Sequence, residues 1–150
     1  MITGNKRLSP EEVADYRQLA QQGLPGLSIR YVDWFGIQPF KAQLDILRKA
    51  DIMVSGIGTA LFYSAFLPPG SVCINTGWRD GSIPTYGEDI LGMSNRRTRF
   101  LYMPLEQVRK GITRTDLEKE ISKAATMVTR GVRVQDPEAR VHSSGLPLAT

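Results

Sequence analysis

One short run of residues has the composition of an anion-binding turn: Ser55, Gly56, Ile57, Gly58, Thr59 and Ala60. Glycines permit a tight turn and let a ligand approach the backbone, and a helix that follows presents N–H groups and the positive end of its dipole to phosphate. The run is not G-x-G-x-x-G, since Leu61 occupies the last glycine position, and no P-loop G-K-[ST] is present. A turn of small residues that serves only packing is the alternative.

Several side chains near this run have a functional and a structural interpretation. Phe62, Tyr63 and Phe66 could stack on a nucleobase or line a pocket, but aromatic residues at helical spacing are more often part of a core. Asp33 ends a predicted strand, where it could bind a sugar hydroxyl or simply cap a turn.

The remaining candidates carry positive charge or could act as bases. The single histidine, His142, lies in a presumed tail, so no Ser-His-Asp or Cys-His arrangement is available. No C-x-x-C, H-x-x-H or E-x-x-H pattern supports a metal site. Four arginines could pair with a diphosphate or could simply be exposed to solvent: Arg79, Arg96, Arg97 and Arg99.

The composition is that of one compact globular domain. The chain has 150 residues, of which 41% are hydrophobic and 23% charged, with a formal net charge of +4. The mild positive charge suits a polyphosphate ligand without requiring one, and no basic patch with interleaved aromatic residues favours nucleic acid. The lone Cys73 excludes an internal disulfide and is expected to be buried.

The long uncharged stretch between Ile52 and Thr76 does not predict a membrane span. Pro68, Pro69 and Gly70 interrupt it after about 17 residues, fewer than the roughly 20 that a span needs. The polar start of the chain has no signal-peptide pattern.

Helices and strands are expected to alternate along the chain. A capping box of Ser9 and Glu12 begins the first helix, which Gly23 ends, and Thr115 with Glu118 begins the last, which Gly131 ends. This order predicts an α/β fold with a Rossmann-like parallel sheet and helices on both faces. Strands are expected at 27–33, 52–54, 71–74 and 99–103, and further helices at 39–50, 59–66 and 86–93.

Part of this pattern resembles the carboxy-terminal part of family 61 glycosyltransferases. That family shows a helix ending in A-D, a strand, an H-G-A-G-L-T-like turn, a helix and P-P-G before another strand. The resemblance covers about a third of the chain well and extends loosely over residues 9–130. The matching pieces are A-D at 50–51, I-M-V at 52–54, G-T-A-L at 58–61, F-L-P-P-G at 66–70 and S-V at 71–72.

The resemblance implies one lobe of a GT-B type enzyme that binds a UDP-sugar donor and transfers the sugar to a hydroxyl of a glycan or protein. Such enzymes generally work without a metal or other cofactor, since a helix dipole and basic side chains neutralise the leaving diphosphate. Residues 1–134 would form the nucleotide-sugar-binding lobe and 135–150 a flexible tail. The chain would then be a fragment whose N-terminal lobe is missing, or a relative that has lost its acceptor-binding half. In eukaryotes such enzymes work in the secretory pathway. The implied donor-binding residues are Ser55, Gly56, Ile57, Gly58, Thr59, Ala60, Tyr63 and Asn75, with Arg79 as a possible phosphate ligand.

The chain departs from the family pattern at the turn and in the following strand. Ile57 stands where the family has histidine, and Asn75 stands where an acidic residue is common. Thr59 and Ala60 also exchange the small residues of the turn. A catalytically silent binding or assembly module is therefore the alternative to an active transferase, and an unrelated nucleotide-binding domain is a third interpretation.

Overall fold

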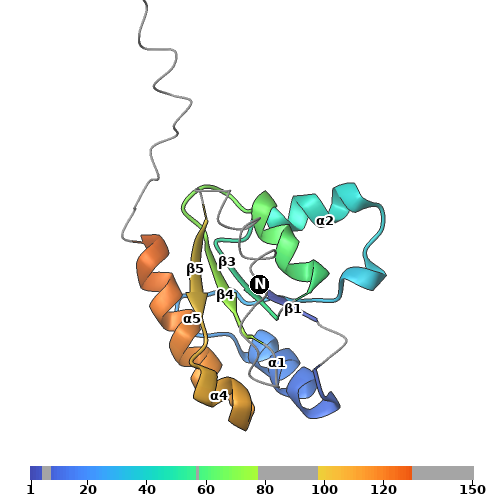
Figure 1. Ribbon diagram of the computed structural model, residues 1–150. Helices are drawn as coiled ribbons and strands as arrows, with labels where there is room; N and C mark the ends of the chain where they lie inside the picture. The colour runs from blue at the N-terminus through green and yellow to red at the C-terminus, as the bar shows by residue number, and fades with distance from the viewer. Residues whose placement is uncertain (5–7, 57, 78–97, 130–150) are drawn as a thin grey trace, which may run out of the picture.

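The computed structural model describes residues 1–4, 8–56, 58–77 and 98–129, which form a five-stranded sheet between two layers of helices (Figure 1). The strand order is β2-β1-β3-β4-β5, and every neighbouring pair is parallel. This Rossmann-like α/β arrangement confirms the predicted fold class. The elements are β1 (Ile2–Thr3), α1 (Pro10–Gln22), β2 (Tyr31–Val32), η1 (Trp34–Gly36), α2 (Phe40–Leu47), β3 (Ile52–Ser55), η2 (Thr59–Phe66), β4 (Val72–Asn75), β5 (Arg99–Tyr102), α4 (Leu105–Lys110) and α5 (Arg114–Thr129).

Helices cover both faces of the sheet. Alternate residues of a strand point to opposite sides, and the apolar side chains on each side pack against a layer of helices. Val54 and Ile74 pack against α1 and α5, whereas Met53 and Cys73 pack beneath α2 and η2. Cys73 is fully buried, as predicted. A strand buried on both faces needs a continuous apolar run, which explains why β3 and β4 were recognisable from sequence.

The central strand β1 was not predicted. It has only two residues, too few to show a period, yet Ile2 and Thr3 are almost fully buried. Of the strand expected at 27–33, only Tyr31–Val32 (β2) forms. β2 lies at the edge of the sheet and pairs only with β1, which has two residues. The backbone N–H of Ile2 donates to the carbonyl of Arg30 at 2.8 Å.

The helix predicted at 59–66 has the expected bounds but is a 3₁₀ helix, η2. Its three-residue turn places Leu61, Ser64 and Leu67 on one buried face. The α-helical spacing of Phe62 and Phe66 therefore does not bring them into the core, and their exposed fractions are 37% and 46%. The core interpretation of these two rings is wrong for this reason.

The first helix, α1, begins and ends as predicted. Ser9 Oγ accepts from the Glu12 N–H, Glu12 Oε2 accepts from the Ser9 N–H, and Gly23 follows the last turn. Its first turn thus carries carboxylates that satisfy the positive end of the helix dipole.

The last helix, α5, begins two residues earlier than predicted, because its cap is Thr113 rather than Thr115. Thr113 and Asp116 exchange the capping hydrogen bonds expected of Thr115 and Glu118, and these bonds hold the pKa of Asp116 below its usual value. Glu118 instead pairs with Arg114 at 2.6 Å. The short helix α4 was not predicted. The helix expected at 86–93, the helix stop at Gly131 and the tail at 135–150 lie outside the described residues.

No helix within the described ranges combines the length and the hydropathy that a membrane crossing would require.

The buried amino group of Met1 makes stability depend on pH. Its N–H donates to the Ile52 carbonyl at 2.8 Å, and burial lowers its pKa from 8.0 to about 6, opposed by the charge of Asp51. Between these values the unfolded chain binds more protons than the folded chain, so the free energy of unfolding rises with pH. We expect a rise of up to about 2 kcal/mol between pH 6 and 8 in urea denaturation.

The Nα-acetylated chain is the matched control, because it keeps the N–H bond to Ile52 without the titrating charge. Equal pH slopes for the free and acetylated chains would contradict this assignment.

Candidate functional site

The strand order defines where a ligand is expected. β1 lies between β2 and β3, so the chain direction across the sheet reverses between β1 and β3. In open α/β sheets, ligands bind outside the carboxyl ends of the strands at such a switch point. Gly4 follows β1 and Gly56 follows β3, so both flanks of the crevice carry glycine.

The predicted turn follows β3 at this edge. Ser55 ends the strand and is buried, and its Oγ donates to the Gly56 carbonyl at 3.1 Å. Gly58 has φ 136°, which side-chain-bearing residues rarely adopt, and a Cβ built there would meet no atom of the described residues within 4 Å. Ile57 and the side chain of Thr59 lie outside the described part of the structure.

The two helices that begin beside the crevice, α1 and η2, differ in whether side chains of their own first turn cap the N-terminus. α1 begins with a capping box and two acidic residues in its first turn. η2 begins at Gly58 with no side-chain cap and no acidic residue in its first turn, and Ala60 is its second residue. The β3 side is therefore the more favourable one for an anion.

Asn75, the last residue of β4, has a buried amide nitrogen without a partner among the described residues. Its exposed fraction is 1%, and it pairs across the sheet with Ser55. Oδ1 accepts from the Gly77 N–H at 2.8 Å, whereas Nδ2 has no acceptor. Cys73, two residues earlier, faces η2, so the Asn75 side chain lies on the η2 side of the sheet. An unsatisfied buried N–H costs about 1–3 kcal/mol, which a ligand oxygen would recover.

Unpaired polar atoms concentrate at this edge. Within the described ranges, four buried side-chain atoms lack a partner: Trp34 Nε1, Ser64 Oγ, Asn75 Nδ2 and Gln107 Oε1. Trp34 follows β2, Asn75 ends β4, and Gln107 lies in α4 after β5. Three of the four therefore follow the carboxyl end of a strand. Sequence reasoning missed Trp34 and Gln107, since neither belongs to a motif.

The structure places Tyr63 away from the β3 turn. Its hydroxyl donates to Gln43 Oε1 at 2.7 Å, and its ring lies 4.7 Å from that of Trp34 and 6.2 Å from that of Phe40. Gln43 Nε2 in turn donates to the carbonyls of Trp34 and Ile37. This network connects η1, α2 and η2, so the Tyr63 side chain stabilises the packing of these three elements. A donor-binding role for Tyr63 stays a prediction.

The charged candidates divide into placed and undescribed residues. Asp33 caps η1, since its Oδ1 accepts from the Phe35 N–H at 3.1 Å, which confirms the capping alternative. Arg99 begins β5 and pairs with Val72, so it lies at the amino edge. Four candidates lie outside the described residues: Arg79, Arg96, Arg97 and His142.

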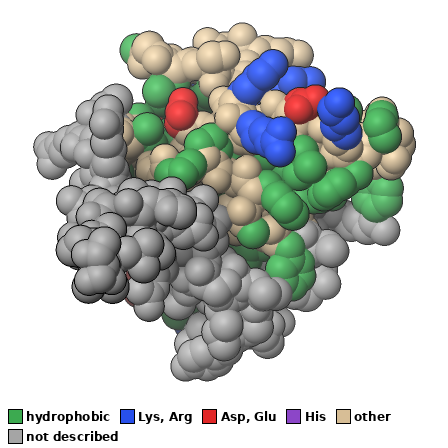
Figure 2. All heavy atoms as spheres, turned by 90° about the horizontal axis from the view of Figure 1, so that it is seen from above, with side chains coloured by type: hydrophobic (Ala, Val, Ile, Leu, Met, Phe, Trp, Pro, Cys, Tyr) green, Lys and Arg blue, Asp and Glu red, His purple; other side chains and the backbone are tan. Residues whose placement is uncertain are grey.

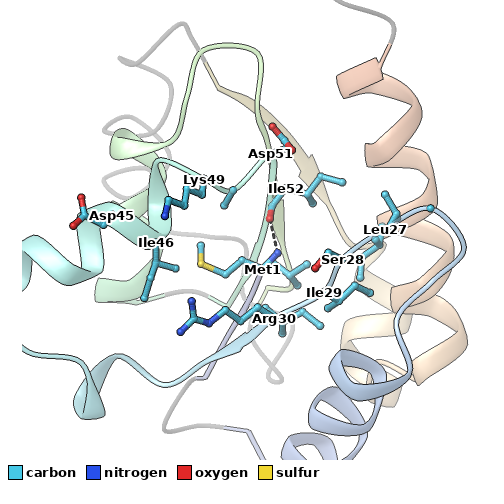
Figure 3. A pocket seen from close by; sticks show the side chains of 15 residues that line it. Met1, Leu27, Ser28, Ile29, Arg30, Asp45, Ile46, Lys49, Asp51 and Ile52 are labelled. Atoms are coloured by element: carbon cyan, nitrogen blue, oxygen red, sulfur yellow. Dashed lines mark hydrogen bonds between the residues drawn. The ribbon is translucent and has the colours of Figure 1, made fainter.

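A cavity of about 430 Å³ lies at the opposite, amino edge of the sheet. In Figure 3 the side chains of Arg30 and Lys49 flank that of Met1, whose amino group bonds the Ile52 carbonyl. Basic and acidic residues both line this cavity. On the face of the molecule shown in Figure 2, Lys and Arg also lie beside acidic and apolar side chains. None of the lining residues has a buried polar side-chain atom without a partner, so the carboxyl edge has more of the chemistry of a ligand site.

Among the residues that the structure describes, no group of three or more His, Cys, Asp or Glu side chains could hold a metal ion. Comparisons with models of protein families, with curated proteins and with solved structures find no match to this chain.

The burial of Asn75 predicts a pH-dependent variant. Asn75→Asp keeps the acceptor for the Gly77 N–H but places a carboxyl group in a buried position, which raises its pKa above that in the unfolded chain. The folded variant then binds more protons, so it loses stability as the pH rises above about 4. We expect a loss of at least about 2 kcal/mol relative to the parent at pH 7, measured by urea denaturation between pH 4 and 7.

The control is Gln18→Glu, which adds the same charge at an exposed position of α1. If both variants show the same pH dependence, the position of Asn75 is not the buried one described here.

Proposed function

We propose that this chain is the donor-binding lobe of a GT-B type glycosyltransferase that takes a UDP-sugar. The resemblance of residues 50–72 to family 61 glycosyltransferases supports the activity, and the Rossmann-like sheet is the kind of lobe that such an enzyme needs. The observation that carries the site is the buried, unpartnered Nδ2 of Asn75 beside the β3 turn.

In this proposal the diphosphate lies against the turn from Ser55 to Gly58. Open space at Gly58 lets phosphate oxygens approach the backbone, and the start of η2 supplies a dipole without a competing carboxylate. Asn75 Nδ2 donates to an oxygen of the ligand while Oδ1 holds Gly77. No metal or cofactor enters, since the dipole and basic side chains carry the electrostatic task. The acceptor is a hydroxyl of a glycan or protein, and a second lobe completes the cleft.

A catalytically silent module is the second candidate function. It is favoured by the two departures from the family pattern, Ile57 in place of histidine and Asn75 in place of an acidic residue. The Asp33 carboxylate caps η1, and the Ser55 hydroxyl donates to a backbone carbonyl. Inverting transfer needs a base that removes the proton of the attacking hydroxyl. Such a module would bind the nucleotide sugar without transferring it.

Calorimetric titration with UDP and UDP-sugars tests donor binding. We expect a dissociation constant of about 0.1–1 mM, as suits a single lobe without its partner. Asn75→Ala should weaken binding about 10-fold, because a hydrogen bond to a charged ligand is lost. Ser64→Ala is the matched control, since it also removes an unpartnered buried polar group but lies away from the edge.

No heat with folded protein at millimolar UDP would contradict the proposal, as would equal effects of the two variants. Where binding is seen, assays for UDP-sugar hydrolysis and for transfer to hydroxyl acceptors separate the enzyme from the silent module.

A further inference from the structure

Gly4, directly after β1, lies beneath the hydroxyl group of Tyr31. A Cβ built at Gly4 would lie 2.7 Å from Tyr31 Oη, so only glycine leaves room for this hydroxyl. The Gly4 N–H donates to the Val32 carbonyl at 2.8 Å, which fixes the backbone there. The Tyr31 side chain starts in β2 and reaches the carboxyl end of β1, one flank of the switch point.

Arg17 of α1 joins this pair. Its guanidinium carbon lies 5.2 Å from the centroid of the Tyr31 ring, so the positive charge lies over the ring. Burial raises the pKa of Tyr31 while Arg17 opposes the rise, so the hydroxyl stays a protonated donor at neutral pH. In the described part of the chain, Arg17 has no carboxylate within ion-pair distance, although the guanidinium is exposed.

The two donors therefore lie on the β1 side of the crevice, whereas the β3 turn and Asn75 lie on the other side. An unpaired guanidinium held by a ring keeps its fork of N–H groups for an oxyanion, and such charge-assisted bonds are strong and geometrically specific. The glycine beside them lets the Tyr31 hydroxyl reach the end of β1. The charge of Asp33 contributes to the raised pKa of Tyr31, and the Asp33 carboxylate caps η1.

We propose that Gly4, Arg17 and Tyr31 form a phosphoryl-binding subsite on the β1 side of the switch point. Arg17 supplies the positive charge and the Tyr31 hydroxyl a neutral donor, and Gly4 leaves the room that this hydroxyl occupies. The inference deepens the proposed function and rests on it for the wider ligand: this subsite binds one phosphoryl group of the diphosphate, across the crevice from Asn75.

Calorimetry with inorganic pyrophosphate, UDP and uridine tests the subsite on the full chain. Arg17→Gln should weaken pyrophosphate and UDP binding about 10-fold, and Tyr31→Phe should weaken both by a smaller factor. Arg17→Lys should restore part of the loss, because it returns the charge without the fork. Arg30→Gln is the matched control, since it removes one exposed arginine from the amino-edge cavity. Circular dichroism confirms that each variant is folded.

The two proposals fail in different ways. If Asn75→Ala weakens UDP binding while Arg17→Gln and Arg30→Gln both leave it unchanged, the subsite is overturned and the donor lobe stands. If pyrophosphate binds through Arg17 but uridine adds nothing to the affinity of UDP, the subsite stands and the nucleotide sugar is overturned. Equal losses for Arg17→Gln and Arg30→Gln would show only a general charge effect and overturn the subsite.

Discussion

The pairing of the two-residue strand β1 with β2 on one side and β3 on the other is the constraint on which the sheet depends. Ile2 bonds the Arg30 carbonyl, and Val54 bonds the Met1 carbonyl, so β1 alone joins β2 to the remaining strands. This pairing also creates the switch point, because the chain proceeds to opposite sides of the sheet from β1 and from β3. The same few hydrogen bonds thus fix both the fold and the edge at which a ligand is expected.

The carboxyl edge combines a glycine turn with polar groups for which the described residues provide no partner. Gly58 leaves space at the backbone, Asn75 keeps a donor without a partner among the described residues, and Arg17 packs on the Tyr31 ring. A buried donor without an acceptor is costly, so Asn75 Nδ2 is the group at this edge that supports the proposed ligand. The amino-edge cavity has volume but lacks such groups.

Sequence reasoning succeeded where burial or capping imposes a pattern. The sequence predicted β3 and β4 from their apolar runs, and α1 from the capping box of Ser9 and Glu12. It also predicted the glycine turn after β3. It failed for β1, which is too short to show a period, and for η2, whose three-residue repeat exposes Phe62 and Phe66. The group of Gly4, Arg17 and Tyr31 comes from three elements, so only the folded chain brings it together. A glycine just after a strand was its one visible signal.

The most direct test of the central claim is a titration of the ¹⁵N-labelled chain with UDP, followed through the side-chain amide signals in ¹H–¹⁵N correlation spectra. The account predicts that the Asn75 amide protons shift as Nδ2 gains an acceptor. The Gln43 amide is the internal reference and should stay in place, because it already donates to the Trp34 and Ile37 carbonyls. Shifts of the backbone amide signals of Arg30 and Lys49 at the amino-edge cavity, with the Asn75 side-chain signals unchanged, would contradict the account.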